Sequence, residues 1–335
     1  MSRGLSIALV KLSSLGDVVH ALPVAATLRA RVPDVRLTWI VESREAAVLR
    51  DHPGLDAIVP IDTRRWRRAR GLGDLAAVVR AVAGARRRLR RERFDVAVDL
   101  QGLIKSALIT ASTRAPLRIG FAARRCREPL SAVFTNRRVQ PPAAARHIVD
   151  QYLALLAPLG VTEPVREFRL PVDAAAEARA DEFLAARGLK PGRRLVVLNP
   201  GSRRPAKRWP EERFRTLAGR LKEDAAADVL VVWGPGEDEA GRLIAGGGRA
   251  VLGPPTNLYD LLAYLRRASA LVAADTGPLH LAAALGTPCV GLYGPTSAVR
   301  NGPYGAGHRS LQAPGGRVAA IEVDAVFHAV TELLG

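Results

Sequence analysis

Short apolar runs alternate with longer amphipathic stretches through the first hundred or so residues. The runs predict strands at residues 5–10, 36–42, 57–61 and 94–100, and the stretches between and after them predict helices, notably at 73–92 and 103–112. Strands that alternate with helices form parallel sheets, because each crossover helix returns the chain to the same end of the sheet. This part of the chain therefore predicts one doubly wound, Rossmann-like domain.

The alternation lapses between about residues 113 and 172, where arginine and proline are frequent and one helix is expected near 146–158. We interpret residues 163–173 as a linker. The pattern then resumes and predicts a second sheet of the same kind. Its expected strands are 194–200, 228–234, 249–252, 270–275 and 288–294, and its expected helices are 210–223, 236–245, 258–267, 278–285 and 321–334.

The length of 335 residues also indicates two domains, because it exceeds what one ordinary hydrophobic core holds. We expect an N-terminal domain at residues 1–168, a C-terminal domain at 169–320, and a final helix in 321–335 that could pack back toward the N-terminal domain. Sheets of this kind bind ligands at the carboxyl ends of their strands. The two domains are therefore expected to face each other across a cleft.

Composition narrows the class of protein. No apolar run approaches the roughly 20 residues of a membrane span, and no leader resembles a signal peptide, so a cytoplasmic protein is expected. We interpret the two cysteines, Cys126 and Cys289, as packing residues. The net charge is +18, and residues 64–93 hold twelve arginines against two acids, which favours an anionic partner. Nucleic acid, an anionic membrane surface and a polyanionic small substrate all fit this charge.

Several phosphate-binding motifs are absent from the sequence. No G-x-G-x-x-G follows a strand, no G-x-x-x-x-G-K-[ST] occurs, and no two aspartates stand two apart. Dinucleotide enzymes and P-loop nucleotidases are therefore disfavoured. A bound diphosphate would have to be neutralised by cationic side chains and backbone dipoles rather than by an aspartate-held cation.

The second domain contains such groups. In "NPGSRRPAKRWP" (199–210), Gly201 and Ser202 can offer amides and a hydroxyl to a phosphate, and Lys207 can add a charge, although the loop could equally be a solvated basic turn. In "AADTGPLHLAAALGTP" (273–288), Asp275 or Thr276 can cap a helix whose free amides would form an anion site.

Two further side chains of this domain are ambiguous. His280 lies on the first turn of that helix and could donate to a phosphate, but a lone histidine on an apolar helix is more often a core residue. Glu237 follows a strand and could accept hydrogen bonds from ribose hydroxyls, or it could simply stabilise the start of a helix.

In the first domain, "KLSSLGDVVHALP" (11–23) places Asp17 in the first turn of a helix, with Lys11, Ser13 and Ser14 along the same turn. Asp17 can act as a helix cap or as a general base. In "DLQGLIKSAL" (99–108), two polar side chains follow the fourth strand, and arginines in two further segments suit carboxylates and phosphates. These residues are Gln101 and Lys105, and Arg64, Arg65, Arg67 and Arg127.

These motifs resemble those of the family 9 glycosyltransferases, the bacterial ADP-heptose:lipopolysaccharide heptosyltransferases, over nearly the whole chain. "KLSSLGDVVHALP", "RRWRRA", "DLQGLIKSAL" and "REPLSAVFTNR" are similar to the heptosyltransferase I branch, whereas "NPGSRRPAKRWP" is closer to heptosyltransferase II. The resemblance implies a GT-B fold. It also implies an inverting, metal-independent transfer of L-glycero-D-manno-heptose from ADP-heptose to a Kdo sugar of Kdo-lipid A, with no cofactor.

The resemblance also assigns roles to residues. It implies that Asp17 is the catalytic base and that Lys207 holds the donor phosphates and assists catalysis. It places Glu237 on the ADP ribose, and the arginines of 64–68 with Lys105 and Arg127 on the Kdo carboxylates and lipid A phosphates. We expect the acceptor site to include Lys11, Ser13, Ser14 and Gln101 as well. The remaining donor-site positions that it implies are Asp275, Thr276, Gly277 and His280.

The same resemblance implies partners and location: ADP-heptose, Kdo-lipid A and the inner-leaflet membrane surface, with the enzyme peripheral at the cytoplasmic face. Three alternatives stay open. The acceptor could be that of another family 9 heptosyltransferase, or the chain could be a nucleotide-sugar epimerase of the same fold. A basic nucleic-acid-binding protein is disfavoured, because aromatic residues make up only 5% of the chain and no stacking platform is evident.

Overall fold

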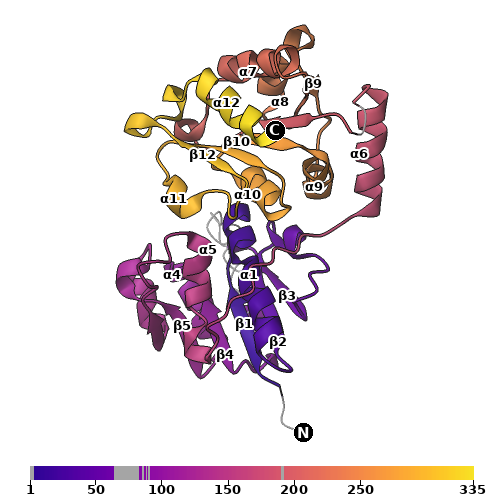
Figure 1. Ribbon diagram of the computed structural model, residues 1–335. Coiled ribbons are helices and arrows are strands. Elements are labelled where there is room, and N and C mark those ends of the chain that lie inside the picture. The colour runs from indigo at the N-terminus through magenta and orange to yellow at the C-terminus, as the bar shows by residue number, and fades with distance from the viewer. Residues whose placement is uncertain (1–3, 64–82, 85–86, 88, 90, 190–191) are drawn as a thin grey trace, which may run out of the picture. The chain divides into compact units, whose positions relative to one another are not determined.

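The computed structural model describes residues 4–63, 83–84, 87, 89, 91–189 and 192–335, and the chain divides into two compact units, Met1–Arg169 and Leu170–Gly335 (Figure 1). Each unit is built around its own sheet and helices. Within the described residues, no helix combines the length and the apolar character that a membrane crossing requires.

The first unit contains a six-stranded parallel sheet with strand order β3-β2-β1-β4-β5-β6. Its central strand β1 is fully buried and pairs with β2 on one side and β4 on the other. A strand covered on both faces carries a continuous apolar run, which explains why β1, β2 and β4 could be predicted from the sequence. The strands are β1 (Ser6–Val10), β2 (Arg36–Glu42), β3 (Ala57–Ile61), β4 (Val96–Asp99), β5 (Leu117–Phe121) and β6 (Arg137–Val139).

Helices in the described part of this unit follow the strands. The longest, α1 (Leu15–Arg31), buries Val18, Leu22 and Ala25, a spacing of about one turn that turns one face of the helix to the core. The others are α4 (Ile104–Ser112), α5 (Ile148–Ala154) and the 3₁₀ helices η1 (Ala46–Leu49), η2 (Ala123–Arg125), η3 (Pro129–Phe134) and η4 (Ala157–Leu159).

The second unit repeats this architecture with the strand order β12-β11-β10-β7-β8-β9. Counted from its own first strand, that order is the same as in the first unit. The expected pair of doubly wound parallel sheets is therefore confirmed. The strands are β7 (Leu195–Asn199), β8 (Asp228–Val231), β9 (Val251–Leu252), β10 (Ala270–Ala274), β11 (Cys289–Tyr293) and β12 (Arg309–Gln312).

Amphipathic helices cover this second sheet. In α7 (Glu211–Glu223), Phe214, Leu217 and Leu221 are buried at helical spacing, and the Phe214 ring meets the buried Trp209 edge-on at 4.8 Å. The C-terminal helix α12 (Val323–Leu334) contributes Val330 and its neighbours to the core of this same unit. The other helices are α6 (Ala174–Ala186), α8 (Asp238–Ala245), α9 (Leu258–Arg267), α10 (Gly277–Ala284), α11 (Ala298–Asn301) and the 3₁₀ helices η5 (Pro205–Lys207), η6 (Gly246–Gly248), η7 (Pro314–Gly316) and η8 (Val318–Ala320).

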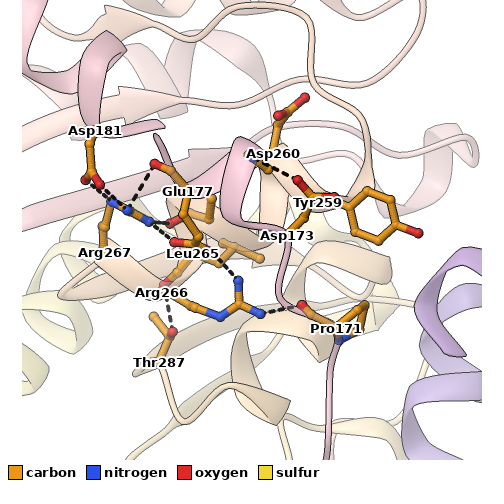
Figure 2. Close-up of polar contacts among 12 residues, drawn as sticks. Pro171, Asp173, Glu177, Asp181, Tyr259, Asp260, Leu265, Arg266, Arg267 and Thr287 are labelled. Carbon is orange, nitrogen blue, oxygen red and sulfur yellow. Dashed lines mark hydrogen bonds and ion pairs between the residues drawn. The ribbon is translucent and has the colours of Figure 1, made fainter. Parts of the chain in front are cut away.

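Helix α6 is joined to α9 by a group of ion pairs (Figure 2). Glu177 accepts hydrogen bonds from Arg266 and Arg267, and Asp181 accepts from Arg267 Nε at 2.6 Å. Arg266 also donates to the carbonyl of Pro171 at 2.6 Å. These contacts fix the start of the second unit on its own helices.

Three strands and one long helix were not predicted from the apolar pattern, nor were the one-turn helix α11 and the 3₁₀ helices. Strands β5 and β6 lie in the arginine-rich and proline-rich segment where the alternation lapses and only a helix was expected. Strand β12 and helix α6 were also missed. Strands β6 and β12 are edge strands with mostly exposed side chains, and an exposed strand needs no apolar run.

Candidate functional site

The strand order places a switch point in each sheet. In the first unit β1 and β4 are neighbours although they are not consecutive, and in the second unit β7 and β10 have the same relation. The connections that leave such a pair diverge to opposite sides, which opens a crevice at the carboxyl ends of the strands. The polar side chains predicted from the motifs gather at these two points.

In the first unit, Lys11 follows β1 directly and is buried, with only 3% of its side chain exposed. Its Nζ lies 2.6 Å from the hydroxyl of Tyr152, 3.2 Å from the carbonyl of Leu100 and 3.7 Å from Oδ1 of Asp17. Burial alone would lower the pKa of Lys11, but the contacts with Tyr152, Asp17 and Asp99 outweigh it and raise the pKa. Lys11 is therefore charged, and the polar groups around its Nζ compensate the cost of burying that charge.

Asp17 lies in the first turn of α1, where it both caps the helix and meets solvent. Oδ2 accepts from the amide and the hydroxyl of Ser14 at 3.0 and 2.8 Å, and Tyr152 lies 3.5 Å from Oδ1. The capping interpretation is thus confirmed. The side chain is 44% exposed, so the carboxylate is also accessible from solution.

Gln101 connects the ends of β1 and β4. Its Oε1 accepts from the amide of Leu12 at 2.7 Å. The buried carboxylate of Asp99 in turn accepts from the amide of Gln101 at 2.8 Å and from the hydroxyl of Ser106 at 3.1 Å. Burial raises the pKa of Asp99, against the effect of these hydrogen bonds. Gln101 therefore shapes the loop that carries Lys11 and Asp17, and its side-chain oxygen is engaged within the protein.

Lys105 lies in the first turn of α4, and its Nζ is 3.4 Å from Oε1 of Glu42. Glu42, at the end of β2, is buried and also accepts from the amide of Thr63 at 3.1 Å and from its hydroxyl. The lysine is consequently paired in this structure, with 30% of its side chain exposed.

The other predicted acceptor-side residues are spread more widely. Arg127 is exposed after η2, Ser13 is half-buried, and Ser14 is exposed as the residue that caps α1. Arg64, Arg65 and Arg67 lie outside the described residues.

In the second unit, three predicted side chains form one connected group at the switch point. Lys207 Nζ lies 2.5 Å from Oδ2 of Asp275 and 3.2 Å from its carbonyl oxygen, and His280 Nε2 lies 3.0 Å from Oδ1. Burial would raise the pKa of Asp275, but His280 and Lys207 outweigh it and hold the pKa well below the usual range. Asp275 is therefore ionised, and it orients both a lysine and an imidazole.

The helix that follows begins at this group. Thr276 is the residue before α10, and its hydroxyl donates to the carbonyl of Ala274 at 3.2 Å instead of capping the helix. Gly277 and Pro278 then form the first turn. Since Pro278 has no amide hydrogen, the N–H groups of Gly277 and Leu279 are the ones that this end of the helix can offer to an anion.

Glu237 reaches back to the loops that end β7 and β8. Its Oε2 accepts from the amide of Gly234 at 2.8 Å. A Cβ added to Gly201 would lie 2.0 Å from the same oxygen, so any side chain at this position would displace the Glu237 carboxylate. Ser202 is buried, and its hydroxyl is bonded within its own turn to the backbone of Arg204 at 3.3 Å. Gly201 and Glu237 are thus brought together, whereas the Ser202 hydroxyl stabilises its own turn.

The group at the end of β7 and β10 has the chemistry of an anion site with an adjacent carboxylate. It combines a cation, a helix N-terminus and a glycine that allows close approach, which together can bind phosphates. A carboxylate beside such a site can accept from sugar hydroxyls. In the described part of the chain, no three His, Cys, Asp or Glu side chains are grouped so that they could hold a metal ion.

Motif reasoning missed Tyr152, Glu42 and Asp99. Tyr152 lies on α5, 141 residues from Lys11, and its role follows only from tertiary packing. Asp99 and Glu42 could have been predicted, because each is an acid at the end of a buried strand, and parallel sheets bring polar side chains together at that end.

Comparison with known proteins agrees with this geometry. The family model of glycosyltransferase family 9 (heptosyltransferase) matches residues 82–319. Lipopolysaccharide heptosyltransferase 1 of Escherichia coli O18:K1:H7 (strain RS218 / NMEC) is 32% identical over 327 residues, which are 97% of this chain and 96% of the relative. The Pseudomonas aeruginosa protein of the same name is 34% identical over 304 residues, 89% of this chain and 81% of the relative.

Solved structures extend the comparison. The E. coli heptosyltransferase WaaC with ADP is 29% identical, with a TM-score of 0.81 over 98% of this chain and 100% of that one. The GT-B fold expected from the sequence is confirmed. The chain belongs to glycosyltransferase family 9, the heptosyltransferases, and is a glycosyltransferase.

Proposed function

We propose that this protein is a heptosyltransferase I, which transfers L-glycero-D-manno-heptose from ADP-heptose to a Kdo residue of Kdo-lipid A in inner-core lipopolysaccharide synthesis. The observation that carries the proposal is the 32% identity to lipopolysaccharide heptosyltransferase 1 over 97% of the chain. The residues of both crevices supply the groups that such a reaction needs.

The second unit would bind the donor. Lys207 and the first-turn amides of α10 would neutralise the diphosphate, and Glu237 would accept from the ribose hydroxyls. In the structure Lys207 is paired with Asp275, so the lysine is already positioned before any donor arrives. His280, held by Asp275, would donate to the same phosphates. The negative charge that develops on departing ADP would be stabilised by these preorganised groups.

The first unit would supply the base. Asp17 would accept the proton of the attacking Kdo hydroxyl while that oxygen forms a bond to the anomeric carbon of heptose. The bond from the anomeric carbon to the diphosphate oxygen breaks in the same step, and ADP leaves from the opposite face, so the configuration is inverted. No step of this mechanism uses a metal ion, since the leaving group is neutralised by Lys207 and helix amides.

The acceptor would be held by basic side chains of the first unit. Lys105 and Arg127, with the arginines of residues 64–68, suit the Kdo carboxylates and lipid A phosphates. We place the enzyme at the cytoplasmic face of the inner membrane, because its acceptor is a lipid and its net charge of +18 favours anionic headgroups.

Transfer can be tested directly. Purified protein is incubated with ADP-heptose and Kdo-lipid A, with and without EDTA, and the product is weighed by mass spectrometry. We expect Kdo-lipid A to gain one heptose residue in both incubations. Product that forms only without EDTA would contradict the metal-independent mechanism, and conversion of the donor to an epimer without transfer would support the epimerase alternative.

A second acceptor is worth including, because "NPGSRRPAKRWP" is closer to the corresponding motif of heptosyltransferase II. A parallel incubation with Kdo-lipid A that already carries one heptose separates the two. Under our proposal this acceptor is a poor substrate. Faster transfer to it than to Kdo-lipid A would assign the chain to heptosyltransferase II.

A further inference from the structure

Large apolar side chains are exposed together at one place on the first unit. Seven such side chains are exposed in the described part of the chain, and three of them, Val172, Leu243 and Val299, lie on separate segments of the second unit. The other four lie on α4 and η3 and are called here the apolar patch: Ile104, Leu108, Leu130 and Val133. Leu130 and Val133 are each 69% exposed.

The spacing of these residues places each pair on one face. Ile104 and Leu108 are four residues apart in an α-helix, and Leu130 and Val133 are three apart in a 3₁₀ helix, where such residues lie above one another. Helices α4 and η3 pack against each other. Glu128, just before η3, accepts from the amide of Ile104 at 2.7 Å and donates its own amide to the carbonyl of Gly102 at 3.2 Å. Exposed groups of this size that cluster on neighbouring elements mark an interaction surface.

The segment that carries the apolar patch is strongly basic. Between residues 102 and 140 the only acid is Glu128, whose carboxylate is engaged by the backbone of α4. The same segment exposes six arginines, after α4, on η2, before η3 and on the edge strand β6: Arg114, Arg124, Arg125, Arg127, Arg137 and Arg138. An apolar surface on a strongly basic segment is complementary to a layer of anionic headgroups over hydrocarbon.

We propose that the apolar patch docks the first unit onto an anionic phospholipid bilayer, with Leu130 and Val133 inserted at the headgroup boundary and the arginines on the phosphates. Apolar insertion or charge alone gives weak, reversible binding, whereas the two together give stable attachment. The inference deepens the proposed function, because it names the surface by which the enzyme would reach a lipid acceptor.

The position of the patch fits this role. Helix α4 begins three residues after Gln101, whose side chain bonds to the loop that carries Lys11 and Asp17. The patch therefore starts at the carboxyl edge of the first sheet, beside the acceptor-side residues. A lipid-linked sugar could reach that edge while its acyl chains stay in the bilayer.

Vesicle sedimentation tests the proposal without any transferase substrate. The full chain is mixed with vesicles of phosphatidylglycerol and phosphatidylethanolamine, or with vesicles of phosphatidylcholine alone, at low and high salt. We expect binding to the anionic vesicles, and at least about a tenfold loss of affinity in Leu130→Ser/Val133→Ser. Arg124→Gln/Arg125→Gln should lose roughly fivefold per arginine at low salt and much less at high salt.

The matched control is Val172→Ser/Val299→Ser, which removes two apolar side chains of the second unit that are 66% and 53% exposed and should bind like the wild type. Thermal melting checks that each variant is folded. Folding is expected in each case, because the substituted side chains are exposed and do not belong to the core. Wild-type affinity in Leu130→Ser/Val133→Ser, or no binding of the wild type to anionic vesicles at low salt, would overturn the proposal.

Sedimentation velocity distinguishes membrane docking from self-association through the apolar patch. If the wild type self-associates and Leu130→Ser/Val133→Ser is monomeric with unchanged vesicle binding, the patch is an interface between copies and the proposal is wrong. Failure of the proposed function can be told apart from failure of the docking proposal. A protein that binds vesicles through the patch but transfers no heptose supports the docking surface and contradicts the transferase assignment.

Discussion

Lys11 illustrates how a buried charge can organise one half of a site. An ammonium group with 3% of its side chain exposed is tolerated only because the hydroxyl of Tyr152, a backbone carbonyl and nearby carboxylates compensate it. The same Tyr152 hydroxyl lies 3.5 Å from Asp17. The carboxylate that we propose as base is therefore held between the start of a helix on one side and a fixed cation on the other.

Asp17→Asn tests the base at the scale of a single residue. The amide can still accept from the Ser14 backbone, so the cap survives, but it cannot take a proton. We expect kcat to fall by roughly 10²- to 10⁴-fold with little change in ADP affinity, measured by steady-state kinetics and calorimetry. Ser14→Ala is the control, because it removes a hydrogen bond to Asp17 and keeps the carboxylate. An equal loss in both variants would assign Asp17 a purely structural role.

His52 gives a prediction about pH. It is buried, its Nδ1 accepts from the amide of Gly54 at 3.1 Å, and burial together with the charge of Arg169 lowers its pKa to about 4. Between pH 6.5 and 4 the unfolded chain therefore binds a proton at this residue that the folded chain does not. By linkage, His52 should cost on the order of 3 kcal/mol of folding stability as the pH falls from 7 to 4.

His52→Asn is the appropriate comparison, because its side-chain oxygen can accept from Gly54 and does not titrate. Urea unfolding at a series of pH values should show a steeper loss of stability on acidification in the wild type than in the variant. Parallel curves for the two proteins would show that His52 does not couple folding to pH.

At the scale of elements, the attachment of α6 to α9 depends on partly buried ion pairs. Hydrogen bonds with Asp181 and Glu177 raise the pKa of Arg267 far above its usual value, so this arginine stays charged at any pH of interest. We expect Arg267→Met to destabilise the protein by about 1–3 kcal/mol in denaturant unfolding, because Glu177 and Asp181 lose a charged donor. Arg179→Met, at a pair whose arginine is 54% exposed, should cost less than about 1 kcal/mol. Equal effects would show that burial of the pair is unimportant.

The elements that could be predicted are those that the core requires to be apolar. Strands such as β1 and β10, buried along their whole length, are continuous apolar runs, and α7 shows a clear helical period. Helix α6 buries mainly alanines, whose weak hydrophobicity leaves little pattern, and its ion pairs come from distant residues. Edge strand β6 consists of two exposed arginines and a valine. Both elements depend on tertiary partners that a local pattern does not contain.

The same division holds for the site. Lys207, Asp275 and His280 lie in recognisable motifs at strand ends, and the structure brings them into one group. Tyr152 lies in no motif and reaches Lys11 only through the packing of α5. Ser202 shows the opposite case, because the motif suggested a phosphate ligand and the structure bonds its hydroxyl within the turn. Motifs therefore indicated where the chemistry gathers, and packing determines which atoms are available.

At the scale of the whole molecule, the proposed reaction requires that Asp17 of the first unit and Lys207 of the second act on one donor. The chain passes between the units once, and both ends of that connection are anchored within their own units. Val165 and Thr27 exchange two hydrogen bonds at 2.9 and 3.0 Å, and Arg266 holds the carbonyl of Pro171. Residues 166–170 lie between these two anchoring contacts, and Arg166 is also paired with Asp150 of the first unit at 3.4 Å.

A ligand that contacts both units should therefore change the average dimensions of the protein. We expect small-angle X-ray scattering to show a smaller radius of gyration with saturating ADP-heptose than without it, because binding selects conformations in which both units meet the donor. Lys207→Ala, which removes the cation proposed to hold the diphosphate, should show no decrease at the same ligand concentration. Calorimetry establishes saturation of the wild type in the same buffer. An unchanged radius of gyration for the saturated wild type would mean that donor binding does not draw the units together, and closure would then have to await the acceptor.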